Sequence, residues 1–225
     1  NYIYTDTQLP LDVLKSALID NGMTNKTIAY ESTCHYLPKN FVDFCSQLSP
    51  ASRVVDGSGL VEQLRLIKSD EEIKLMRRAA KISEKAMLAG LNATEYGESE
   101  NAIAAEVCRE MFSQGGEYPA VMPYITSGPR CLIGHATWEN RTLDHDECVF
   151  IELAGCLKRY HTAMMRTIYI GKPPQAVMDA HAIVDEALRT ALEVLKPGVR
   201  VCDADRAIRN VTKKIHHTGG KMVSR

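Results

Sequence analysis

The sequence predicts a two-domain protein of mixed α/β (α+β) class. Three observations lead to this prediction. A capped amphipathic helix opens at Ser69, apolar runs typical of buried strands fill residues 120–170, and the pattern of a long helix, a glycine break and a short helix occurs twice. We expect residues 1–62 to form the last part of a smaller α/β domain and residues 63–225 the first part of a larger one.

The first domain is predicted to contain two helices and two short strands. Apolar stripes and short β-prone runs indicate a helix around Leu11, Leu14 and Leu18, a strand at 27–30, a helix at 37–48 and a strand at 53–56. The run Gly57-Ser58-Gly59 then predicts a turn. The domain boundary is therefore expected between residues 59 and 68.

The second domain is predicted to open with two helices. Ser69 and Glu72 form a capping box at the start of a long helix, which Gly90 and Gly97 are expected to break. A second helix is predicted over residues 99–114, with an apolar stripe of Ile103, Val107 and Met111 and a stop at Gly115-Gly116. Strands of a central sheet should follow.

The end of the chain repeats this pattern of helices. Pro173-Pro174 predict the start of a long helix with an inward side, which consists of Val177, Ile183, Ala187, Leu188 and Leu195. Ala102-Ile103 and Ala207-Ile208 occupy equivalent places about 105 residues apart, which indicates an internal duplication. Only the first helix pair is followed by about fifty residues of strands, so we expect a fold that is incomplete at its C-terminus.

The composition favours an enzyme of the cytoplasm. The 27 basic and 28 acidic residues are interspersed, which speaks against a nucleic-acid partner. No apolar stretch is long enough to span a membrane, and the first residues do not form a signal peptide. Seven cysteines without a Cys-x-x-Cys pair predict reduced thiols. Cys156 has two interpretations, a nucleophile or a small core residue.

Glu152 is the residue that points most directly to chemistry. Cys148 to Ile151 is an apolar, β-prone run that predicts a buried strand, and Glu152 continues directly out of it. An unpartnered buried carboxylate costs several kcal/mol, so such a group is normally paired, protonated or functional. The alternative to a catalytic Glu152 is an ion pair, with Arg166 as the expected partner.

The segment after Glu152 resembles the creatinase and aminopeptidase P family of pita-bread hydrolases. Metal-dependent members carry one Asp at the end of such a strand and a second eleven positions later, before a Thr-Arg-Thr-like strand. This chain has Glu152 at the first position and Ala163 at the second, followed by Met164-Met165-Arg166-Thr167. Because an alanine methyl cannot bind a metal, the resemblance implies a relative with no metal and no cofactor.

Within the family, three runs resemble the ectoine hydrolases: residues 134–143, 151–156 and 159–161. The resemblance implies a metal-independent hydrolase that opens the cyclic amidine of ectoine to N-acetyl-diaminobutyrate, acting as a homodimer on a small cationic substrate. Creatine amidinohydrolase usually carries Glu where this chain has Met165. The alternatives are a metal-dependent Xaa-Pro aminopeptidase or prolidase, creatine amidinohydrolase, and a non-catalytic binding module.

The expected site contains two catalytic and four substrate-binding residues. Glu152 and His135 are the catalytic pair, because a carboxylate can hold an amidinium and an imidazole can exchange a proton near neutral pH. Substrate contacts are expected from Tyr160, His161, Trp138 and Arg166. Strand alternation leaves open whether Tyr160 or His161 faces the pocket. His216-His217 is interpreted as a surface pair rather than a metal site.

Overall fold

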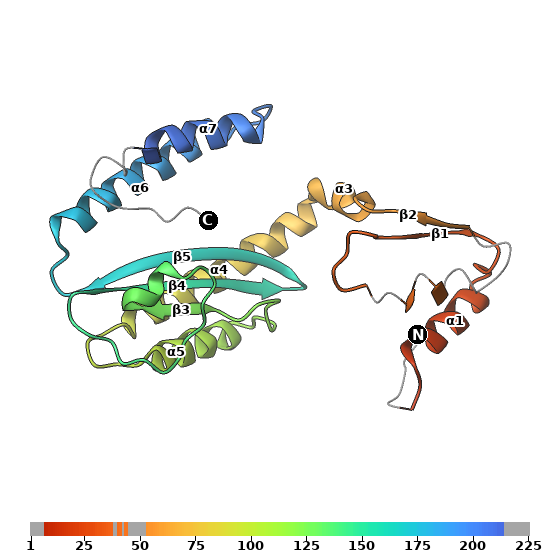
Figure 1. Cartoon of the computed structure of the whole chain (residues 1–225), viewed down its shortest axis with the longest axis horizontal. Helices are drawn as coiled ribbons and strands as arrows, with labels where there is room; N and C mark the ends of the chain where they lie inside the picture. Colours follow the sequence, from red (N-terminus) through yellow and green to blue (C-terminus); the bar gives the residue numbers. More distant parts are fainter. Residues whose placement is uncertain (1–6, 38–39, 42, 45–52, 214–225) are drawn as a thin grey trace. The chain divides into compact units, whose positions relative to one another are not determined.

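The structure is a computed structural model that describes residues 7–37, 40–41, 43–44 and 53–213 (Figure 1). The chain divides between Glu71 and Glu72 into two compact units. That these units are parts of two incomplete domains with a boundary at residues 62/63 stays a prediction. The predicted helix at 37–48 falls largely outside the described residues, and His216-His217 lies entirely outside them.

The first unit has a small parallel sheet. Strands β1 (Thr27–Tyr30) and β2 (Arg53–Asp56) pair in parallel over their full lengths and have the predicted bounds. Helix α1 (Pro10–Asp20) precedes them, as the leucine stripe predicts. Helix α3 (Leu60–Leu66) lies in the segment 59–68, where a domain boundary is expected, and this short helix was not predicted.

The second unit contains a three-stranded antiparallel sheet in the order β3-β4-β5. Its elements are α4 (Asp70–Asn92), which begins just before the division, α5 (Glu100–Ser113), β3 (Tyr124–Ser127), the 3₁₀ helix η1 (Gly128–Leu132), β4 (Glu147–Leu157), β5 (Tyr160–Ile170), α6 (Gln175–Val194) and α7 (Val201–Thr212). The predicted strands and the helix at 99–114 are confirmed. Figure 1 shows α4 passing behind the strands of the sheet and α5 below them.

The core lies between this sheet and the helices α4 and α5. Apolar residues of both layers are buried in one cluster, which includes Ile82, Met87, Ile103, Val107, Val149, Ile151 and Leu153. Ser99 caps α5 by accepting a hydrogen bond from the Ala102 N–H at 3.1 Å. The core therefore covers the face of β4 on which Val149, Ile151 and Leu153 lie. Phe150 and Glu152, which alternate with them along the strand, lie on the other face.

Gly90 does not break the first helix as predicted, because α4 continues through it to Asn92. A Cβ atom at Gly90 would lie 2.7 Å from Val107 Cγ2 and 3.2 Å from Ile151 Cδ1. The glycine is thus used for close packing of α4 against α5 and β4 rather than for termination. The helix ends at Asn92, two residues after Gly90, and Gly97, which has a positive φ of 84°, lies in the turn that follows.

Helix α6 shows a second departure from the prediction. Ala187 is buried, but Leu188 and Leu195, both predicted to point inward, are more than half exposed. Among the described residues, α6 packs mainly against α7. Both helix pairs of the predicted duplication are present, while the duplication itself stays a prediction. No helix in the described part of the chain combines the length and apolarity needed to cross a membrane.

Candidate active site

Glu152 lies on the face of β4 that α4 and α5 do not cover. Along the strand, Val149, Ile151 and Leu153 are buried in the core, whereas Phe150, Glu152 and their even-numbered neighbours are partly exposed. The Glu152 carboxylate has no hydrogen-bond or ion-pair partner in the described part of the chain. A half-buried carboxylate without a partner can bind a cationic ligand.

The sheet register identifies the neighbours of Glu152. Tyr124 on β3 and Met165 on β5 lie directly opposite Glu152, one on each side. Ala154 and Ala163 form the next pair on the same face. Directly paired residues share a face of the sheet, so Glu152 is surrounded by an aromatic ring, a thioether and two methyl groups.

This surrounding does not fit a two-metal centre. Ala163 lies on the face of Glu152, at the position where the resemblance implies a second metal-binding Asp, and it supplies no donor atom. Across the described ranges, no group of three or more His, Cys, Asp or Glu side chains is placed to hold a metal ion. The residues described here therefore do not provide the several carboxylates that bridged divalent ions need.

His135 lies beside the face of the sheet that carries Glu152, because its ring contacts the Tyr124 ring. It lies in the segment after η1, has a positive φ of 59°, and is exposed. Its ring centroid is 5.0 Å from that of Tyr124, and the two planes are tilted by 30°. Since Tyr124 is the direct cross-strand partner of Glu152, the structure brings His135, Tyr124 and Glu152 to one end of the face. Tyr124 was not identified from the sequence.

His161 also lies on the face of Glu152, because it pairs with Cys156. Both of its ring nitrogens bind backbone: Nε2 accepts a hydrogen bond from the Ala120 N–H, and Nδ1 donates to the Arg159 carbonyl, each at 3.0 Å. His161 lies four residues along β5 from Met165, the partner of Glu152, which corresponds to roughly 13 Å at about 3.3 Å per residue. The described contacts thus give His161 a role in fixing the loop before β3.

Tyr160 and Arg166 lie on the opposite, helix-covered face. The Tyr160 hydroxyl donates to the Glu72 carboxylate at 2.6 Å. Arg166 pairs with Ile151, lines a hollow beside α4, and donates from Nη1 to the Met165 carbonyl at 2.7 Å. The alternative in which Arg166 neutralises Glu152 is therefore wrong. The structure does not bring Tyr160 or Arg166 together with Glu152.

Two further candidates belong to the interior. Trp138 is half-buried and packs against the core cluster, which favours a packing role over the substrate contact expected of it. Cys156 is fully buried on β4. Because a nucleophile must reach its substrate, this burial favours the core interpretation of Cys156.

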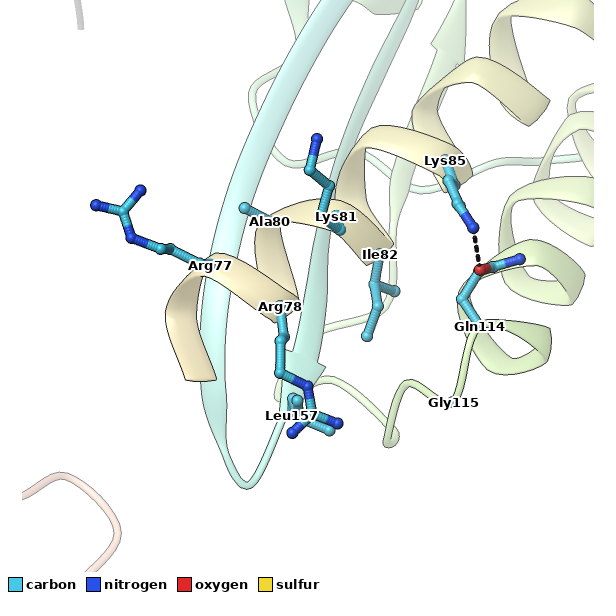
Figure 2. Close-up of a pocket in the computed structure, with 9 residues that line it drawn as sticks. All are labelled: Arg77, Arg78, Ala80, Lys81, Ile82, Lys85, Gln114, Gly115 and Leu157. Carbon is cyan, nitrogen blue, oxygen red and sulfur yellow. Dashed lines mark hydrogen bonds between the residues drawn. The ribbon is translucent and has the colours of Figure 1, made fainter. Parts of the chain in front are cut away.

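Three hollows in the described part of the chain lie away from the Glu152 face. Figure 2 shows one of about 610 Å³ between α4, the end of α5 and the hairpin tip at Leu157. Its lining carries the cationic side chains of Arg77, Arg78, Lys81 and Lys85, and Lys85 donates to Gln114 at 2.6 Å. This hollow is on the helix side of the sheet and cannot receive a ligand that binds Glu152.

Glu147, at the start of β4, holds the segment that follows His135. Arg141 donates to both of its carboxylate oxygens, and the Asp144 N–H donates to one of them at 2.9 Å. Burial alone raises the pKa of Glu147, but these hydrogen bonds outweigh burial and the net pKa lies below its ordinary value of 4.5. Glu147 therefore stays ionised in the folded protein.

Glu147→Gln is expected to lower the free energy of unfolding near neutral pH by about 2 kcal/mol, because hydrogen bonds to a charged group are lost. A carboxyl whose folded-state pKa is lowered adds stability above its unfolded pKa, and this stability disappears as pH falls through the folded value. The difference from wild type should therefore shrink below a pH of about 4.5. Urea unfolding across this range measures it, and a constant difference would contradict the assignment.

Comparison with known proteins places the chain in a family. The model of metallopeptidase family M24 matches residues 74–223. The chain is 31% identical over 218 residues to ectoine hydrolase of Halomonas elongata, covering 92% of this chain and 55% of that protein. It is 29% identical over 186 residues to Xaa-Pro dipeptidase of Pyrococcus horikoshii, covering 83% and 52%. The chain thus spans about half the length of these relatives.

Solved structures show the same architecture. Prolidase from Pyrococcus furiosus matches with a TM-score of 0.80 and 27% identity over 89% of this chain and 59% of that one. X-Pro aminopeptidase from Thermotoga maritima matches with a TM-score of 0.78 and 26% identity over 96% and 60%. These matches confirm the family and the pita-bread fold that the sequence resemblance implied. The chain belongs to metallopeptidase family M24.

Proposed function

We propose that this chain carries part of the active site of a hydrolase that opens the cyclic amidine of ectoine without a metal ion. The observation that carries the proposal is the half-buried Glu152 carboxylate, which stands without a partner beside Tyr124 while Ala163 occupies the place of a second acid. The similarity to ectoine hydrolase over 92% of the chain supports the same substrate.

The chemistry follows from the charge of the ligand. An amidine ring is protonated near neutral pH, and a carboxylate can accept a charge-assisted hydrogen bond from one of its ring N–H groups. The aromatic ring of Tyr124 and the apolar groups of Met165 and Ala163 lower the local polarity, which strengthens this attraction. The face that contains Glu152 therefore suits a small, flat cation.

The proposed reaction adds one water molecule. Glu152 takes a proton from water as the water oxygen bonds to the amidine carbon. His135 then carries a proton to the leaving ring nitrogen as the C–N bond breaks. The product is N-acetyl-diaminobutyrate, with one acetamide and one free amine. No other reactant is needed, because the atoms of ectoine and water equal those of the product.

Two alternative substrates remain within the family. Xaa-Pro peptides are supported by the similarity to the dipeptidase of Pyrococcus horikoshii, but this chemistry requires metal donors that Ala163 does not supply. Creatine is less well matched, because Met165 stands beside Glu152 where the creatinase branch usually has Glu. A homodimer, as the resemblance implies, is part of the proposal.

Incubation of the intact protein with ectoine, creatine and an Xaa-Pro dipeptide distinguishes the proposed reaction from its alternatives. Mass spectrometry should show ectoine gaining one water, with the other two compounds unchanged. Cleavage of the dipeptide alone would assign the chain to the peptidases of the family. Absence of any turnover, with ectoine binding unaffected by Glu152→Gln, would leave a binding module as the better description.

A further inference from the structure

The segment that carries His135 is tied at both ends to one buried carboxylate. Glu100, the first residue of α5, has a side chain with no exposed surface. It accepts hydrogen bonds from the Ser127 hydroxyl at 2.7 Å, where β3 ends, and from the Glu139 N–H at 2.8 Å, four residues beyond His135. One group thus fixes the chain on either side of His135.

Arg130 completes this attachment from within the segment. Its Nη1 donates to both Glu100 oxygens, at 3.1 and 2.8 Å, and its Nη2 donates to the Thr137 carbonyl at 2.5 Å. Four hydrogen bonds therefore end on the Glu100 carboxylate, and the guanidinium extends the attachment to the second residue after His135. The exposed His135, held at a positive φ of 59°, lies inside a segment whose ends are fixed.

An ion pair is a costly way to fill a protein interior. Removing two charges from water costs free energy that their attraction only partly returns, and apolar residues of similar volume often stabilise a fold equally well. A carboxylate and a guanidinium, however, fix the directions of several hydrogen bonds at once, which apolar packing cannot do. Here those bonds determine where residues 130–139 run.

We infer that Glu100 and Arg130 are positioning residues, which hold His135 against Tyr124 at the end of the Glu152 face. This inference rests on the proposed function, because it gives the placement of His135 a catalytic purpose. Neither residue touches the face itself: Glu100 is buried behind the segment, and Arg130 binds Glu100, Thr137 and Glu139. Their effect on turnover must therefore pass through His135.

A double-mutant cycle with His135 tests this route. Glu100→Gln keeps the shape but removes the charge, and Arg130→Lys keeps the charge but loses the forked contacts. Each should lower the kcat of the intact enzyme by roughly 10 to 100-fold, the cost expected of a misplaced catalytic group. In a His135→Asn background neither should lower kcat further, because the group they position is already gone. Glu106→Gln, on the exposed side of α5, is the matched control and should have no effect.

A merely structural role predicts a different cycle. If Glu100 and Arg130 only stabilise the fold, their effects would multiply with that of His135→Asn, and this result would overturn the inference. Full activity in both single variants would also overturn it. If His135→Asn itself keeps wild-type activity, the catalytic role of His135 in the proposed function fails. NMR of the His135 ring then decides whether Glu100 and Arg130 position it.

NMR of the His135 ring tests the positioning without any substrate. The Tyr124 ring, 5.0 Å away, should shift the His135 Hε1 signal through its ring current. Glu100→Gln and Arg130→Lys should move this signal toward that of a free histidine, and Tyr124→Leu identifies the contribution of the ring. An unchanged signal in both folded variants would refute the positioning role, whatever the enzyme hydrolyses.

Discussion

Glu152→Gln is expected to lower the turnover of ectoine at least about a hundredfold, the smaller end of what general acid–base groups contribute. The amide has nearly the same shape, but it carries no charge for the amidinium and takes no proton from water. Because the Glu152 carboxylate has no partner among the described residues, its replacement should leave the fold intact. Steady-state kinetics and circular dichroism of the same preparation measure both expectations.

The control for this experiment is Glu106→Gln, which removes an exposed carboxylate of α5 whose ion-pair partner within the described ranges is Arg109. It should retain wild-type kcat and KM, since exposed ion pairs contribute little. Turnover within about tenfold of wild type in Glu152→Gln would remove Glu152 from the mechanism.

Gly155→Ala is expected to destabilise the protein by about 3 kcal/mol, the upper range for overpacking of a tight interior. A Cβ atom at Gly155 would lie 2.6 Å from the Ala79 carbonyl oxygen and 2.9 Å from Ser83 N. Both are backbone atoms of α4, which cannot turn aside as a flexible side chain can. The same contact carries the hydrogen bond from Gly155 N–H to the Ser83 hydroxyl at 2.8 Å, so α4 and β4 would have to separate.

Urea unfolding of Gly155→Ala measures this loss, and Gly134→Ala is the matched control. A Cβ atom at Gly134 meets no heavy atom within 4 Å, so that variant should unfold with the wild-type midpoint. Equal midpoints for all three proteins would show that α4 does not pack on β4 as closely as described here.

Local sequence signals predicted most of the secondary structure. The bounds of β1 and β2 follow from short β-prone runs, and α5 follows from the Ser99 cap and its apolar stripe. Gly90 was misread because a glycine that permits close packing and a glycine that ends a helix look alike in sequence. Only the tertiary neighbours Val107 and Ile151 distinguish the two uses.

The candidate site was predictable only in part, for a similar reason. Glu152 stands out because a carboxylate directly continues an apolar, β-prone run, which is a local pattern, although the strand itself extends to Leu157. Tyr124 was missed because its place beside Glu152 depends on how β3 pairs with β4, and register is set by long-range contacts. Glu100 resembles an ordinary acidic residue in the first turn of a helix, and nothing nearby in the sequence reveals its contacts with Ser127, Arg130 and Glu139.

Turnover of ectoine by protein stripped of metal ions tests whether the proposed hydrolysis proceeds without a metal. The intact protein is treated with a chelator, its metal content is measured by mass spectrometry, and its kcat is compared with that of untreated protein and of protein resupplied with zinc or manganese. We expect the same kcat in all three samples, because in the proposed reaction Glu152 and His135 act without a bound ion. Loss of turnover on chelation, with recovery on adding one of these metals, would contradict it.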